Sequence, residues 1–196
     1  NLSSAPIDLY VPYFLGGRSD RTFWKGSLNY LTQVICPVIE QLRFRTIYTA
    51  DPHSQELTYR FSNLRAIDLA PFYDMMIPKG SIIIAPDAGA LNRAQLAASQ
   101  TNAHCVLQVN KQRVEDRIVV NKVGDWPEFS EAYLVDDLCD AGGTFLAIAN
   151  GLPDKRLHLV VTHGLFTAGL NTLLDKFKSV SCTNSADEFI MTKKQC

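Results

Sequence analysis

The sequence predicts an α/β protein built around mostly parallel sheets. Apolar segments of strand length recur at 7–13, 46–49, 81–85, 103–109, 117–120, 131–135 and 157–161. Segments with helical spacing lie between several of them, at 28–41, 92–99, 144–150 and 168–177. Strands that alternate with helices are typical of right-handed βαβ units. A further observation is that polar residues follow the strong strands, at the sheet edge where open α/β folds bind ligands.

Composition limits the classes of function. The chain has 196 residues, 46% of them hydrophobic and 20% charged, so it can bury the core of one large or two small domains. A formal net charge of −1 provides no basic field for nucleic acid or an anionic membrane. No apolar run approaches the ~18 residues of a membrane span. Five cysteines without CxxC or metal-finger spacing fit a reducing compartment, so we expect a cytoplasmic protein.

The most informative segment is 133–145 (YLVDDLCDAGGTF). An apolar strand leads into Asp136 and Asp137, and a Gly-Gly-Thr turn then opens a helical pattern. An ordinary strand-to-helix turn would not need two consecutive acids, because their repulsion costs free energy unless a cation or sugar hydroxyls engage them. We therefore predict a ligand site in which the turn binds a phosphate at the start of the helix.

Polar residues also follow other strands. Asp51-Pro-His-Ser follows the second strand, Pro-Asp87-Ala-Gly follows the third, and Thr-His-Gly follows the last. Several such clusters at strand ends indicate one assembled site. His53 is a candidate contact for a metal or phosphate, whereas His104 and His158 lie within apolar strand patterns and are expected to be structural.

Two segments are rich in positive charge. The segment 16–21 (GGRSDR) follows the first strand through flexible glycines and could wrap a polyphosphate. Lys111 and Arg113 could form a surface pair, or could stabilise charge that develops in a transition state.

Taken in order, these motifs resemble those of the ribose-phosphate diphosphokinases, also called phosphoribosyl pyrophosphate synthetases. The Asp-Asp loop alone would equally suit a phosphoribosyltransferase, but the ordered set is much more specific. The resemblance runs from Val11 to about Ser185. It rests on VPYFLGGRSDR at 11–21, DPHSQ at 51–55, APDAG at 85–89 followed by Arg93, Lys111-x-Arg113, VDDLCDAGGT at 135–144 and THG at 162–164.

The resemblance implies two phosphoribosyltransferase-type (type I) α/β domains with mostly parallel sheets. We expect an ATP-side domain at 1–69, truncated at its N-terminus relative to the family, a second domain at 70–185 and a tail at 186–196. The stretch 71–80 (PFYDMMIPKG) is expected to be the seam between them. The resemblance also implies a homo-oligomer, often a hexamer built from dimers.

The implied reaction is an ATP-dependent diphosphoryl transfer. The C1 hydroxyl of a ribose 5-phosphate attacks the β-phosphorus of ATP and AMP leaves, which depends on positioning and charge neutralisation. The resemblance assigns Mg²⁺ to His53 and Asp87, and catalysis to Lys111 and Arg113 on a mobile loop. It assigns ATP to Arg18, Ser19, Asp20 and His53, and the ribose phosphate to Asp136, Asp137, Asp140, Ala141, Gly142, Gly143 and Thr144.

Two positions depart from the family pattern. Ser19 replaces a glutamine, and Ala141 replaces a threonine of the phosphate loop, which removes a hydroxyl worth about 0.5–1.5 kcal/mol to a phosphate monoester. A phosphate diester carries less charge and needs more room, so ADP-ribose is an alternative acceptor, ranked below ribose 5-phosphate. Its product, the 1-pyrophosphate of ADP-ribose, could be used to rebuild NAD with nicotinamide.

Two readings from other classes stay open. A phosphoribosyltransferase would explain the Asp-Asp loop but would leave His53, Asp87 and Lys111 without a role. A catalytically silent subunit associated with the family is the second, and the presence of those same residues argues against it.

Overall fold

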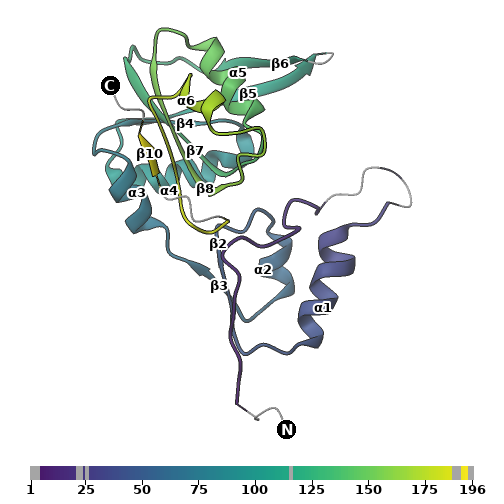
Figure 1. Ribbon diagram of the computed structural model, residues 1–196. Coiled ribbons are helices and arrows are strands. Elements are labelled where there is room, and N and C mark those ends of the chain that lie inside the picture. Colours follow the sequence, from purple (N-terminus) through teal and green to yellow (C-terminus); the bar gives the residue numbers. More distant parts are fainter. Residues whose placement is uncertain (1–4, 21–23, 25–26, 115–116, 187–190, 194–196) are drawn as a thin grey trace. The chain divides into compact units, whose positions relative to one another are not determined.

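The structure is a computed structural model that describes residues 5–20, 24, 27–114, 117–186 and 191–193 (Figure 1). The chain divides into two compact units, Asn1–Asp68 and Leu69–Cys196, each with its own β-sheet. Among the described residues, the strand pairs are parallel except at the two edges of the larger sheet. The predicted α/β class with mostly parallel sheets is confirmed.

The first unit holds a three-stranded parallel sheet in the order β1-β2-β3. Leu9, Ile47 and Leu64 stand side by side on its strands, and residues of both helices pack against them. Because successive side chains of a strand face opposite sides, Tyr10 and Tyr48, one position further along, are exposed. The elements are β1 (Leu9–Tyr10), β2 (Ile47–Ala50), β3 (Leu64–Ile67), α1 (Cys36–Gln41) and α2 (Glu56–Arg60).

The helix expected over 28–41 is divided in the structure. A π-helical turn occupies Leu31–Ile35, and α1 begins at Cys36, whose amide donates to the Leu31 carbonyl five residues earlier. Pro37 follows directly, and proline has no amide hydrogen with which to continue a regular α-helical ladder. The wider turn therefore precedes the proline, as helix irregularities commonly do.

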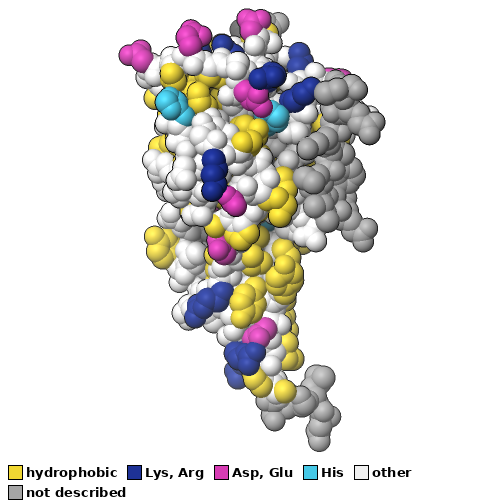
Figure 2. Space-filling model, turned by 90° about the vertical axis from the view of Figure 1, so that its left-hand side faces the viewer, with side chains coloured by type: hydrophobic (Ala, Val, Ile, Leu, Met, Phe, Trp, Pro, Cys, Tyr) yellow, Lys and Arg dark blue, Asp and Glu magenta, His cyan; other side chains and the backbone are white. Residues whose placement is uncertain are grey.

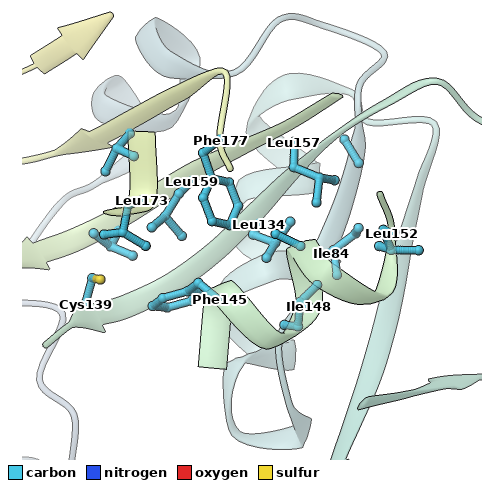
Figure 3. Packing of buried hydrophobic residues seen from close by; sticks show 14 of the residues in the cluster. Ile84, Leu134, Cys139, Phe145, Ile148, Leu152, Leu157, Leu159, Leu173 and Phe177 are labelled. Carbon is cyan, nitrogen blue, oxygen red and sulfur yellow. The ribbon is translucent and has the colours of Figure 1, made fainter. Parts of the chain in front are cut away.

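The second unit holds a seven-stranded sheet in the order β10-β9-β8-β7-β4-β5-β6. Ile84, Leu134 and Leu159 stand in register on three neighbouring strands and share one buried cluster with Phe145 and Ile148 of the helix α5 (Figure 3). The helix α4 contacts β4, β5 and β7 from the other side (Figure 1). Parallel strands buried on both faces read as continuous apolar runs, which is why β7 and β8 were visible in the sequence.

The strands of this unit are β4 (Ile82–Ala85), β5 (Cys105–Val114), β6 (Arg117–Val123), β7 (Glu131–Cys139), β8 (Arg156–Gly164), β9 (Ser179–Cys182) and β10 (Met191–Lys193). The helices are α3 (Ala70–Met76), a 3₁₀ turn at Ala88–Ala90, α4 (Leu91–Thr101), α5 (Gly143–Gly151) and α6 (Asn171–Leu174). Within the described part of the chain, no helix combines the length and apolar character needed to cross a bilayer.

The structure differs from the sequence-based expectation at two places between and beyond the domains. The stretch 71–80, expected as the seam, is largely the helix α3, and the division falls between Asp68 and Leu69, next to the expected domain boundary after residue 69. Pro71 fits the first turn of this helix, where a missing amide hydrogen costs nothing, while Tyr73 and Ile77 are buried. Part of the segment expected as a tail, 186–196, forms β10 antiparallel to β9 in the second unit.

The buried cluster of the second unit yields a stability prediction. Leu159 is fully buried on the interior strand β8. Changing it to Ala should lower the free energy of unfolding by about 2–5 kcal/mol, because a cavity remains. The same change at Leu96, which is 46% exposed on α4, should cost less than about 0.5 kcal/mol. Urea unfolding followed by circular dichroism measures both, and equal losses would contradict the assigned core.

Candidate active site

The paired acids lie at the carboxyl-terminal part of β7. An Asp136 carboxylate oxygen (Oδ1) accepts a hydrogen bond from the Asp137 amide at 2.9 Å. Arg93, on α4, places Nη1 at 3.4 Å from Asp136 Oδ1 and at 4.0 Å from Asp137 Oδ1. The three side chains are only 18%, 6% and 14% exposed for Asp136, Asp137 and Arg93. Two acids and one cation therefore share a largely dry environment.

The electrostatics of this pair favour a positively charged or hydroxyl-bearing ligand. Burial, and next the neighbouring Asp137, raise the pKa of Asp136 to about 8, while Arg93 acts in the opposite direction. One guanidinium does not offset the cost of two buried carboxylates. A ligand that brings a cation or donates hydroxyl hydrogens would relieve that cost.

The loop Asp140–Gly142 links these acids to α5. Gly142 has φ +82°, and a Cβ there would lie 2.9 Å from Leu173 Cδ2, so a larger residue would be strained and crowded. The Leu146 amide donates to the Gly142 carbonyl at 3.0 Å as the first bond of the helical ladder. The amides of residues 143–145 therefore sit at the positive end of the helix, a position that suits phosphate. Ala141 is exposed on this loop.

Hydrogen bonds from a segment that was not identified from the sequence hold this loop in place. Thr167, after β8, donates its hydroxyl to Asp140 Oδ1 at 2.6 Å and its amide to the Asp140 carbonyl at 3.2 Å. The only sequence signal for Thr167 was weak, namely its closeness to the Thr-His-Gly motif. Arg93 had a signal of the same kind, because it follows the Pro-Asp-Ala-Gly motif.

Asp87 lies on the same edge, because β4 and β7 pair in parallel. Its Oδ1 accepts hydrogen bonds from the Gly89 amide at 3.0 Å and the Ala90 amide at 3.2 Å, so this acid caps the turn ahead of α4. Capping is a structural role that the sequence motif did not distinguish from metal binding.

Mg²⁺ fits the carboxylates of this edge only together with a ligand. In the described residues, no group of three or more His, Cys, Asp or Glu side chains is arranged to hold a metal ion. Mg²⁺ usually binds through one or two carboxylates with substrate phosphates and water. The pair at Asp136 and Asp137 offers oxygen donors of that kind.

Lys111 and Arg113 lie on a strand, where the sequence had suggested a mobile loop. The strand β5 continues to Val114 and pairs antiparallel with β6, with Lys111 opposite Val120 and Arg113 opposite Ile118. The alternation of apolar residues ends at Val109, which is why the strand appeared shorter in the sequence.

The histidines of the sheet have structural partners, as expected for His158. Its ring nitrogens lie 2.7 Å from Ser179 Oγ and 2.8 Å from Glu131 Oε1, and its ring stacks on Tyr133. Burial lowers the pKa of His158, which favours the neutral ring. His163 of the Thr-His-Gly motif is buried, with Nδ1 at 2.6 Å from Ser185 Oγ. His104 is exposed, and lies just before β5.

The residues predicted for ATP belong to the first unit. Arg18 lies in a turn that the Ser19 amide closes by donating to the carbonyl of Gly16, a residue with φ +78°, and Asp20 follows it. Asp20 Oδ1 is buried and has no hydrogen-bond partner within the described residues. His53 is exposed just beyond β2. His53 and Asp87 lie in different units, and their pairing at a metal stays a prediction.

A separate hollow of about 440 Å³ lies at the other end of the larger sheet. Ile82 and Glu131, which line it, begin β4 and β7, whereas the paired acids lie towards the carboxyl end of β7. The hollow is therefore not part of the candidate site.

Comparisons with known proteins agree with the motifs. No protein-family model matches the chain. The ribose-phosphate pyrophosphokinase of Aquifex aeolicus is 29% identical over 177 residues, which cover 84% of this chain and 56% of the relative. That of Haemophilus influenzae is 25% identical over 199 residues, which cover 93% and 62%. The resemblance to ribose-phosphate pyrophosphokinases is confirmed.

The crystal structure of a phosphoribosylpyrophosphate synthetase from Mycobacterium smegmatis superposes with a TM-score of 0.79. It is 20% identical, and the match covers 94% of this chain and 63% of that one. This likeness shows a common fold. The chain spans 56% and 62% of the length of the two pyrophosphokinases above, so the activity of the whole protein is a matter for proposal.

The buried acid predicts how stability depends on pH. Because folding raises the pKa of Asp136 from 3.8 to about 8, its favourable contribution is complete below about pH 3.8 and is lost as the pH rises through about 8. The variant Asp136→Asn removes this titration. The free energy of unfolding of the variant minus that of the wild type should therefore increase by at least about 1 kcal/mol between pH 5 and pH 8. We call this difference the gain of the variant.

Chemical denaturation across this pH range measures the gain. The exposed Asp154, changed to Asn, is the matched control and should show no such trend. A gain for Asp136→Asn that stays constant with pH would mean that this carboxyl is not buried in the folded protein.

Proposed function

We propose that the protein is an ATP-dependent diphosphokinase that transfers the β,γ-pyrophosphoryl group of ATP to the C1 hydroxyl of a ribose 5-phosphate, releasing AMP. The observation that carries this proposal is the buried pair Asp136 and Asp137 near the carboxyl end of β7, which leads through Leu138 and Cys139 into a loop at a helix N-terminus. Such an edge suits a phosphorylated sugar. The hydroxyls of the sugar would face the acids, and its phosphate would face the loop that follows them. The similarity to ribose-phosphate pyrophosphokinases supports the reaction type.

On the acceptor side, Asp136 and Asp137 would bind the 2- and 3-hydroxyls of the ribose, directly or through Mg²⁺. The backbone amides of the loop 140–144, which contains Asp140, Gly142, Gly143 and Thr144, would bind the 5-phosphate. The φ of Gly142 and its contact with Leu173 hold the loop in one conformation before a ligand binds. Binding would therefore cost little conformational entropy in the loop.

On the ATP side, Arg18, Ser19 and Asp20 would contact the triphosphate, and His53 and Asp87 would hold Mg²⁺. When bound, Mg²⁺ would neutralise phosphate charge. Lys111 and Arg113 would stabilise the charge that develops on the transferring group. The buried oxygen of Asp20 without a described partner and the positive φ of Asp51, beside His53, are the irregularities that functional turns tend to carry.

Assembly and location are part of the proposal. The first unit exposes several large apolar side chains, and Figure 2 shows apolar groups gathered on its surface. They include Ile7, Tyr10, Leu15, Trp24, Leu28, Leu42 and Tyr59. Surfaces of this kind mark interaction sites and support a dimer-based homo-oligomer, which we place in the cytoplasm because the cysteine pattern fits a reducing compartment.

The direct test is to incubate the purified protein with ATP, Mg²⁺ and ribose 5-phosphate and to measure AMP release. Lys111→Ala should lower kcat by about 10²–10³, the cost of one transition-state donor, with folding unchanged by circular dichroism. Lys79→Ala, at an exposed lysine of the same unit, is the matched control and should retain full activity.

Other outcomes would separate the remaining readings. Pyrophosphate release that needs a nucleobase but no ATP would identify a phosphoribosyltransferase. An unchanged rate in Lys111→Ala would overturn the catalytic assignment of that residue. Binding of both substrates without turnover would identify a silent subunit.

A second acceptor is favoured by Ala141, which is exposed on the phosphate loop and adds no hydroxyl there. ADP-ribose, with a phosphate diester, would need fewer donors and more room than ribose 5-phosphate. The enzyme would then make the 1-pyrophosphate of ADP-ribose, a precursor from which NAD could be rebuilt.

Ala141→Thr tests the choice between acceptors. The added hydroxyl should raise kcat/KM for ribose 5-phosphate by about two- to tenfold, equivalent to 0.5–1.5 kcal/mol, and should lower it for ADP-ribose. Ala168→Thr, at an exposed alanine of the neighbouring loop, is the control. The ADP-ribose hypothesis fails if the wild type never turns this acceptor over, and the role of residue 141 fails if the ratio of the two acceptors stays constant.

A further inference from the structure

We infer that Thr167 is a positioning residue for the phosphate loop, which it holds through Asp140. This inference rests on the proposed function and deepens it, because it names a residue that prepares the acceptor site without touching the acceptor. Neither the motifs nor the comparisons assign this residue a role.

The contacts join two segments that lie far apart in the sequence. The amides of Leu165 and Phe166 both donate to the Cys139 carbonyl, at 2.9 and 3.2 Å, and the Thr167 amide donates to the Asp140 carbonyl at 3.2 Å. The Thr167 hydroxyl adds the bond of 2.6 Å to Asp140 Oδ1. The first residue of the phosphate loop is thus fixed through its backbone and its side chain.

The backbone after β8 is shaped to deliver Thr167 to this place. Phe166 has φ +47°, a left-handed conformation that is unfavourable for an aromatic residue. The ring of Phe166 lies over Gly164, where a Cβ would come within 2.3 Å of the ring. Gly164 therefore leaves room for the ring. The packing of the ring holds Phe166 in its strained backbone conformation, which turns Thr167 towards Asp140.

The hydrogen bond from Thr167 controls where the negative charge of Asp140 lies relative to a bound phosphate. Asp140 carries a carboxylate at the entrance of a loop that would bind a phosphate, so an unrestrained side chain could approach the ligand and repel it. The Thr167 hydroxyl holds one oxygen of that carboxylate in a defined place. Without the hydroxyl, Asp140 gains rotamers and the loop loses its restraint at this point, while the backbone bonds remain.

The experiment compares three variants of the purified protein. Thr167→Val keeps the shape of the side chain and removes the hydroxyl, Thr167→Ser restores the hydroxyl, and Thr172→Val makes the same change at an exposed position of α6. Calorimetry with ribose 5-phosphate and steady-state AMP release are the readouts. Thr167→Val should raise the Kd and the KM for ribose 5-phosphate at least about tenfold, a usual effect of slight misplacement.

A positioning role also predicts what stays constant. The KM for ATP and the melting temperature should change little in Thr167→Val, and both Thr167→Ser and Thr172→Val should match the wild type. If Thr167→Val binds ribose 5-phosphate as tightly as the wild type, the inference is wrong although the diphosphokinase stands. If the wild type neither binds nor converts ribose 5-phosphate or ADP-ribose, the proposed function is wrong and the inference falls with it.

Discussion

In the second unit, β7 and β8 run parallel from the pair Glu131–Arg156 to the pair Cys139–Gly164, and this pairing places the main features of the candidate site. Parallel strands end on the same edge of a sheet, so the loop after β7 and the segment after β8 emerge side by side. The carbonyl of Cys139 can then accept amides from Leu165 and Phe166. A shift of either strand by one residue would move its leucine, Leu134 or Leu159, out of the cluster with Phe145 and onto the opposite face of the sheet. The burial of those leucines therefore also fixes the position of the paired acids.

The site is built from features that weaken the fold. Asp136 and Asp137 are buried beside each other with one guanidinium nearby, and Phe166 has a left-handed backbone. Each such feature costs free energy, and each lies at a strand end on the candidate edge. The apolar cluster around Leu134, Leu159 and Phe145 lies next to them and offsets this cost. Stabilising changes at the paired acids would be expected to remove function, since the destabilised groups are those that a ligand would engage.

How far the sequence allowed prediction depended on the length and burial of each element. The strands β7 and β8 and the helix α5 were found because long apolar patterns admit few alternatives. The strand β3 was missed because only Leu64 of its residues is buried, while Arg65 and Ala66 are exposed. The helix α3 was taken for a seam because the stretch 71–80 contains two prolines and a glycine, although Pro71 lies in the first turn of the helix. Thr167 and its bond to Asp140 could not be predicted, because the contact joins residues 27 positions apart through a backbone geometry that no local pattern encodes.

In the phosphate loop, the residues that hold the backbone in place differ from the exposed residue Ala141, which would face the ligand. Its backbone is set from behind, by the contact of Gly142 with Leu173 and by the hydrogen bonds from Thr167 to Asp140. Ala141 is exposed and takes part in neither restraint among the contacts described. A side chain at this position can therefore change without reshaping the loop, and its effect falls on the ligand. If the amides of the loop bind the phosphate and the paired acids bind the ribose diol, as proposed, the difference between a monoester and a diester would be sensed mainly at Ala141. A single residue on a preset backbone would then tune the choice of acceptor while the rest of the site stays the same.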